Sequence, residues 1–251
     1  MKCDLKSKLN AGKTLLGTWV TIGHTDVPDV LEAVGFDWLV FDTEHAPLGP
    51  ESVSRMVQAI DSSSVCPIVR VGAADQYLVK SAFDMGAHGV VCPMVNNREE
   101  AERVVSYAKY PPEGVRGVAP RKAADYGNSF ADYVRTANEG TVVVVQIETA
   151  EALENLDDIL GTRGVDVAFV GPTDLTMSLG LIDDRGNPRV VEAMERVIEA
   201  CKRHGKTPGV LAATPDEARR DVKLGFRFIG LGSDTRFMMS GAREYLKAAR
   251  E

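Results

Sequence analysis

The sequence predicts an α/β protein folded as a single (β/α)8 barrel, a TIM barrel, over residues 1–251. Eight short runs rich in β-branched residues recur along the chain, and each is followed by a segment with helical spacing. The runs are continuously apolar instead of alternating, which is typical of parallel strands buried on both faces. Eight such units in 251 residues match the usual size of this barrel. A doubly wound parallel sheet is the alternative that the pattern allows.

Each expected strand is short, and the segments between strands have the spacing of amphipathic helices. Residues 97–109 show this best, because small and branched apolar residues form one face while charged residues form the other. The longest irregular stretch, residues 110–130, is rich in proline and glycine, and we expect a loop there and no domain boundary. The expected strands are 17–21, 38–42, 67–71, 89–93, 141–148, 167–171, 208–212 and 226–231.

Composition and charge exclude several classes of protein. The 36 acidic residues outnumber the 29 basic ones, so the chain lacks the positive charge that nucleic-acid or anionic-membrane binding requires. No apolar run approaches the roughly 20 residues that span a bilayer, and the charged N-terminal residues do not resemble a signal peptide. The four cysteines lie far apart without a CxxC pair, which favours a reduced, cytoplasmic protein in which Cys66 and Cys92 are small buried hydrophobes.

Polar residues at the ends of the expected strands are the candidate site, because barrel enzymes place their working groups there. Gln146 and Glu148 are two residues apart on one strand and should point to the same side. Asp174 follows the next strand along the chain. Either carboxylate alone is more simply explained as an ion pair or a helix cap. Two carboxylates from adjacent strands suit Mg²⁺ or Mn²⁺, with coordination positions left for a substrate such as a 2-oxo acid.

Two further strand-end residues suggest acid–base chemistry on that substrate. Arg70 closes an apolar strand and could bind a carboxylate or enolate, although a structural ion pair with Glu44 or Asp42 is equally consistent with its position. His45 lies beside acids at a strand end, where an imidazole can act as a general base or simply be a hydrogen-bonded histidine. The lysines fall in helices, loops or strand starts, so a Schiff-base mechanism is not expected.

Five motifs together resemble the HpcH/HpaI aldolase family, and they occur in the family's order over nearly the whole chain. They are GFDWLVFDTEHAP at 35–47, VCPMV at 91–95, YPPEGVRG at 110–117, QIET at 146–149 and GPTDL at 171–175. The resemblance implies a class II pyruvate aldolase, similar to 2-dehydro-3-deoxyglucarate and 4-hydroxy-2-oxoheptanedioate aldolases, in aromatic or sugar acid catabolism. Such an enzyme reversibly cleaves a 4-hydroxy-2-oxo acid into pyruvate and an aldehyde through a pyruvate enolate.

The resemblance also implies a divalent metal ion, Mg²⁺, Mn²⁺ or Co²⁺, held by Glu148 and Asp174. Arg70 would neutralise the developing enolate, and His45 would move protons while Asp84 orients its ring. A homo-oligomer is implied as well, namely a hexamer in which C-terminal helices are exchanged between subunits.

The remaining implied roles concern the substrate. Asp42 and Glu44, at the same strand end as His45, are possible further site residues. The groups expected around pyruvate are Gln146 at the keto oxygen or a metal-bound water, Gly171, Pro172 and Thr173 at the carboxylate, and Trp19 and Leu211 at the methyl group.

The segment 118–130 diverges from the family, which leaves the aldehyde open. We hypothesise that Arg121 or Lys122 reaches an acidic aldehyde; a solvated basic loop is the alternative. Two other functions stay open: a CoA-thioester lyase of the citramalyl-CoA or malyl-CoA type, and a non-catalytic barrel that binds a 2-oxo acid.

Overall fold

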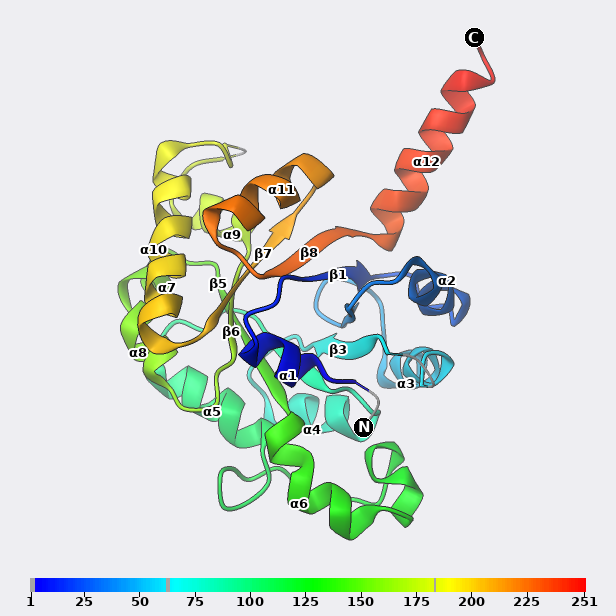
Figure 1. Ribbon diagram of the computed structural model, residues 1–251, viewed down its shortest axis with the longest axis vertical. Helices are drawn as coiled ribbons and strands as arrows, with labels where there is room; N and C mark the ends of the chain where they lie inside the picture. Colours follow the sequence, from blue (N-terminus) through cyan, green and yellow to red (C-terminus); the bar gives the residue numbers. More distant parts are fainter. Residues whose placement is uncertain (1–2, 62–63, 183) are drawn as a thin grey trace.

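Eight parallel strands close into a barrel in the order β1 to β8, and β8 pairs with β1 to complete it (Figure 1). The computed structural model describes residues 3–61, 64–182 and 184–251. The prediction of a (β/α)8 barrel is confirmed, and the doubly wound alternative is wrong because the sheet has no open edge. The strands are β1 (Leu15–Val20), β2 (Trp38–Asp42), β3 (Cys66–Arg70), β4 (Gly89–Cys92), β5 (Val142–Ile147), β6 (Val167–Val170), β7 (Thr207–Ala212) and β8 (Phe228–Ser233).

Helices connect successive strands and cover the outer face of the barrel (Figure 1). Several begin at a side chain that accepts a first-turn N–H; Asp75, Asn97 and Thr149 do so. The expected loop at 110–130 contains a short 3-10 helix, η1. The helices are α1 (Leu5–Asn10), α2 (Asp26–Val34), α3 (Pro50–Ala59), α4 (Gln76–Asp84), α5 (Arg98–Ala108), η1 (Lys122–Gly127), α6 (Phe130–Gly140), α7 (Ala150–Glu154), α8 (Leu156–Gly161), α9 (Pro172–Ser178), α10 (Pro188–His204), α11 (Pro215–Leu224) and α12 (Asp234–Ala248).

The barrel interior is filled by apolar side chains from alternate strand positions, as the two-residue repeat of a strand requires. Trp38 stacks on Phe228 with ring centroids 4.2 Å apart. Gly17 leaves room for that indole, since a Cβ there would lie 1.9 Å from it. Leu5 and Leu9 of α1 complete the cluster and seal the N-terminal end. Polar groups are therefore left to gather at the C-terminal ends of the strands.

The cysteines differ from the expectation. Cys3 and Cys66 form a disulfide with their Cα atoms 5.4 Å apart, so the prediction that Cys66 is reduced is wrong, although the residue is buried in the apolar core as expected. A separation of 63 residues hides this pairing in the sequence, because only the packing of α1 against the barrel brings the two together. Cys92 and Cys201 are free and buried.

The C-terminal helix α12 extends away from the barrel (Figure 1). Its first residue, Asp234, is buried and accepts hydrogen bonds from the backbone N–H groups of Thr21 and Ile22, which anchors the start of the helix. Beyond that residue no side chain of α12 is buried. In the described ranges, no helix is both long and apolar enough to cross a membrane.

Candidate active site

Asp42 and Arg70 form the best-ordered pair at the C-terminal end of the barrel, where β2 and β3 place them side by side. Arg70 donates from Nε to Asp42 Oδ1 at 3.0 Å and from Nη2 to Oδ2 at 2.6 Å. Burial works to raise the pKa of Asp42, but the hydrogen bonds and charge of Arg70 outweigh it and hold the pKa below its ordinary value. Asp42 is therefore ionised and fixes the guanidinium, as the ion-pair interpretation of Arg70 predicted.

Glu44 takes the remaining edge of that guanidinium. Its Oε2 lies 3.1 Å from Arg70 Nη1, which makes an ion pair although the N–H is not aligned for a hydrogen bond. Burial raises the pKa of Glu44 against the opposing charge of Arg70, and the nearby carboxylates of Asp42 and Asp174 add to the rise. Asp42 and Glu44 thus both belong to the site, and Arg70 holds them together.

His45 stands at the mouth of the site. Its side chain is 65% exposed, and Nε2 lies 3.7 Å from Glu44 Oε2. Its backbone N–H donates to Asp42 Oδ1 at 3.2 Å, which fixes the turn that carries it. The imidazole can therefore exchange protons with a substrate and with solvent.

Two predicted residues are not brought to this site within the chain. Asp84 ends α4, which runs from the C-terminal end of β3 back to the start of β4, so Asp84 lies at the opposite end of the barrel from His45. Burial raises its pKa against the charges of Arg116, Lys80 and Arg121. Lys122 also lies at that end and pairs with Asp61 at 2.8 Å. The orientation of His45 by Asp84, and contact of Lys122 with the aldehyde, are thus not found within one chain.

Glu148 is a buried carboxylate of the site, with 4% of its surface exposed. Its Oε1 accepts the backbone N–H of Met94 at 2.8 Å, and its Oε2 accepts Nε2 of Gln146 at 2.6 Å. Burial raises the pKa of Glu148 despite the Met94 hydrogen bond, and the charges of Asp174 and Glu44 act in the same direction. Gln146 Oε1 is buried and has no hydrogen-bond partner among the described residues. The pair therefore presents an unsatisfied oxygen beside a carboxylate.

Met94 is the functional position that the sequence reasoning did not single out. Its φ is +54°, in the left-handed region that a non-glycine residue rarely adopts. This conformation directs its N–H at Glu148. The VCPMV motif includes the residue, but no sequence rule assigns a left-handed conformation to methionine. Such strain is often stored at functional sites.

The end of β6 leads directly into α9. Gly171 lies at this junction, and the first turn of the helix carries Thr173 and Asp174. A Cβ on Gly171 would lie 2.8 Å from Glu148 Oε2, so glycine keeps the space beside that carboxylate open. Pro172 is buried, whereas Thr173 and Asp174 are exposed. Thr173 Oγ1 accepts a hydrogen bond from Arg185 in the loop that follows α9. Asp174 is near enough to shift the pKa of Glu148.

Trp19 and Leu211 form the apolar wall of the same end of the barrel. The Trp19 ring lies 5.8 Å from Arg70 Cζ and 5.3 Å from the ring of Phe169. A Cβ on Gly230 would lie 2.3 Å from the Trp19 ring and 3.2 Å from Leu211 Cδ1, so both side chains pack against this glycine. The apolar surface predicted to contact the methyl group of pyruvate thus lies beside the Arg70 guanidinium.

The donor set fits a hard divalent cation. Glu44, Glu148 and Asp174 interact electrostatically, and the charge of Arg70 acts on both Glu44 and Glu148. These groups offer oxygen only, which Mg²⁺ and Mn²⁺ prefer. Within the described ranges no three acidic, histidine or cysteine side chains converge as a complete metal cage. A site with two protein carboxylates, completed by water and substrate oxygens, is the arrangement that these residues allow.

Comparisons with known proteins identify the family of this chain. The family model for HpcH/HpaI aldolase/citrate lyase matches residues 15–240. A 4-hydroxy-2-oxo-heptane-1,7-dioate aldolase of Salmonella dublin is 39% identical over 96% of this chain and 92% of its own length.

Two solved structures are similar throughout. An HpcH/HpaI aldolase/citrate lyase family protein from Burkholderia cenocepacia J2315 is 35% identical with a TM-score of 0.95, covering 98% of this chain and 99% of that one. An HpcH/HpaI aldolase from Desulfitobacterium hafniense DCB-2 is 30% identical with a TM-score of 0.92, covering 98% and 96%. The chain therefore belongs to the HpcH/HpaI aldolase/citrate lyase family, and it is a carbon–carbon lyase of the aldolase type.

Proposed function

We propose that this aldolase is a class II enzyme that reversibly cleaves a 4-hydroxy-2-oxo acid into pyruvate and an aldehyde. The observation that carries the proposal is the Glu148 carboxylate, which Met94 and Gln146 hold beside the space left by Gly171. The Salmonella relative, whose name specifies a 4-hydroxy-2-oxo diacid, supports the substrate class.

Glu148 and Asp174 would hold the divalent ion, Mg²⁺, Mn²⁺ or Co²⁺, and the unsatisfied Gln146 Oε1 would accept a hydrogen bond from a water or hydroxyl beside it. When bound, the ion supplies Lewis acidity that polarises the 2-oxo group of the substrate.

Arg70 would stabilise negative charge that develops on the oxygen at C2 as the C3–C4 bond breaks. It is suited to this role because Asp42 already fixes its orientation, so little reorganisation is needed during the reaction. His45, exposed at the mouth, would take the proton of the 4-hydroxyl group and return it in the reverse reaction. Trp19 and Leu211 would enclose C3 and exclude water from it.

The test is cleavage of a panel of 4-hydroxy-2-oxo acids with different tails, followed by the release of pyruvate. We expect metal-dependent release by the wild type, and loss of about 100-fold or more in Glu148→Gln. Glu154→Gln is the matched control, because Glu154 is an exposed glutamate on α7. Equal turnover by both variants would contradict the assignment. Cleavage of malyl-CoA or citramalyl-CoA alone would favour the thioester lyase. Absence of turnover with every substrate would favour a protein that only binds a 2-oxo acid.

We also propose a homo-oligomer, a hexamer, in which α12 is exchanged between subunits. The exposed side chains of α12 include Met238, Met239, Tyr245 and Leu246, an apolar set with no cover in one chain. A complementary cavity of about 450 Å³ lies between α11, β8 and the start of β1, and Leu16, Ala218, Val222 and Leu231 are among its lining residues. In a (β/α)8 barrel a helix after β8 would ordinarily cover this region.

A further inference from the structure

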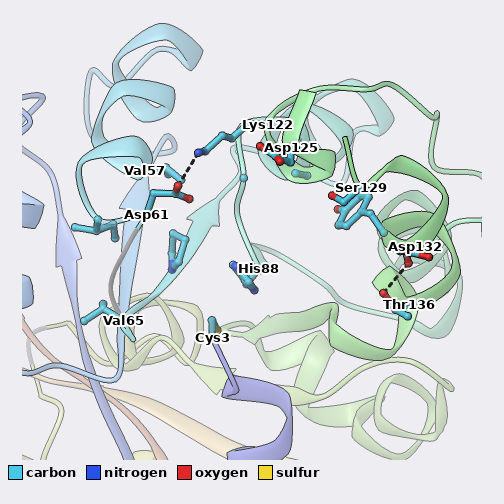
Figure 2. A pocket seen from close by; sticks show the side chains of 15 residues that line it. Cys3, Val57, Asp61, Val65, His88, Lys122, Asp125, Ser129, Asp132 and Thr136 are labelled. Atoms are coloured by element: carbon cyan, nitrogen blue, oxygen red, sulfur yellow. Dashed lines mark hydrogen bonds and ion pairs between the residues drawn. The ribbon is translucent and has the colours of Figure 1, made fainter. Parts of the chain in front are cut away.

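A second cavity, of about 580 Å³, opens at the N-terminal end of the barrel (Figure 2). It lies between the end of α3, the starts of β3 and β4, and the η1–α6 segment, far from the strand ends that carry Arg70 and Glu148. Its volume falls within the range of small-molecule sites. Nothing in the proposed aldolase reaction uses it.

The disulfide forms part of the wall of this cavity, and its two sulfurs have different surroundings. Cys3 lines the cavity (Figure 2). Cys66 is 1% exposed and packs inside the barrel with Leu5 and Trp38. A molecule in the cavity can therefore approach the sulfur of Cys3, whereas the sulfur of Cys66 is shielded by the apolar core.

The same disulfide links α1, the helix that closes the N-terminal end of the barrel, to β3. Cys3 directly precedes α1, which seals the interior with Leu5 and Leu9. Lys6 adds a hydrogen bond to the backbone oxygen of Thr141 at 3.1 Å and an ion pair with Asp166. The covalent link to β3 thus joins the N-terminal segment to the base of the barrel, and breaking it would leave α1 held by noncovalent contacts alone.

The charges of the cavity indicate which molecules it can admit. Lys122 already pairs with Asp61 at 2.8 Å, Asp132 pairs with Arg135, and Asp125 is the remaining acid of the described lining. Burial lowers the pKa of His88 to about 4, so its ring is neutral at pH 7. Lys122 is the only lysine or arginine among the described lining residues, and its pairing with Asp61 leaves it unavailable to an anionic molecule.

We propose that this cavity is a thiol–disulfide exchange site at which a small uncharged thiol attacks the sulfur of Cys3. The thiolate of the incoming molecule forms a bond to Cys3 Sγ while the Cys3–Cys66 bond breaks, and Cys66 leaves as a thiolate that takes up a proton. A second thiol then attacks the mixed disulfide and departs with the first as an oxidised disulfide. Two thiols thus supply the two electrons that reduce the protein. A small disulfide reverses both steps.

The experiment is exchange followed by intact-mass and peptide mass spectrometry under non-reducing conditions. The oxidised protein is treated with 2-mercaptoethanol, and the reduced protein with its disulfide, 2-hydroxyethyl disulfide. We expect a mixed disulfide on Cys3 in both directions, with Cys92 and Cys201 unmodified because they are buried. Cys3→Ser should abolish adduct formation, and Cys201→Ser, a matched cysteine variant, should not change it.

A charge series tests the choice of ligand. At low ionic strength, 3-mercaptopropionate should react no faster than 2-mercaptoethanol per thiolate, because no unpaired lysine or arginine of the described lining attracts its carboxylate. Adducts on Cys66 instead of Cys3, no exchange in either direction, or a faster reaction of the anionic thiol would each overturn the proposal.

Discussion

Substitution of Gly171 by alanine probes the carboxylate at the centre of the site with a single methyl group. The added Cβ would lie 2.8 Å from Glu148 Oε2, 3.3 Å from Glu148 Cβ and 3.5 Å from Gln146 Nε2. Gly171 has φ −91° and ψ 91°, which alanine can adopt, so the backbone itself is not strained. The perturbation therefore acts on the Glu148 side chain.

The size of the effect follows from the contacts of that carboxylate. An ordinary contact needs about 3.4 Å, so Oε2 must move by roughly 0.6 Å, away from a hydrogen bond of 2.6 Å with Gln146. A hydrogen bond to a charged group contributes about 1.5–3 kcal/mol. We therefore expect divalent-metal affinity and kcat/KM to fall about 10- to 100-fold, the usual consequence of disturbing the neighbours of a metal ligand.

The assay is Mn²⁺ binding by calorimetry together with pyruvate release from a 4-hydroxy-2-oxo acid. Gly49→Ala is the control, because a Cβ at Gly49 meets nothing within 4 Å. Both variants should keep the circular dichroism spectrum of the wild type. If Gly171→Ala bound Mn²⁺ and turned over like Gly49→Ala, the assignment of Glu148 as a metal ligand would be refuted.

Three further predictions concern other parts of the molecule. Arg70→Lys loses the two-pronged contact with Asp42, so kcat should fall about 100-fold; a change below threefold would exclude a role in stabilising charge. Burial lowers the pKa of His88 from 6.5 to about 4, so the folded state binds fewer protons than the unfolded state and stability declines as pH falls from 6.5 to 4. Urea unfolding should show that the free energy of unfolding of the wild type falls by about 2 kcal/mol from pH 8 to pH 5, and that His88→Gln lacks this fall. An equal fall in both proteins would contradict the assignment to His88. A chain that ends after Phe237 lacks the exposed apolar part of α12, so light scattering should find a smaller assembly, and an unchanged mass would contradict helix exchange.

Much of the fold was predictable because each strand is a local pattern. The expected strand 38–42 coincides with β2, and the two-residue repeat correctly placed Gln146 and Glu148 on one side of β5, where they are hydrogen-bonded. The pairing of Arg70 with Asp42 was predicted as an alternative, since both end neighbouring strands. Strand-end position alone therefore identified the centre of the candidate site.

The remaining features depend on contacts that sequence spacing does not encode. The N–H of Met94 reaches Glu148 across 54 residues, and only through a left-handed backbone conformation. The Cys3–Cys66 link depends on how α1 plugs the barrel. Asp84 is predicted from a family motif, and a motif carries no information about which end of a helix faces the site.

The most direct test of the account is exchange of the methyl protons of pyruvate in D2O, followed by NMR without any aldehyde. The wild type, stripped with EDTA, should show no exchange above the solvent rate, and added Mg²⁺, Mn²⁺ or Co²⁺ should restore it. Glu148→Gln should stay inactive with every ion. Full exchange in the presence of EDTA, or permanent labelling of the protein by pyruvate and borohydride, would contradict metal-dependent enolisation at Glu148 and Asp174.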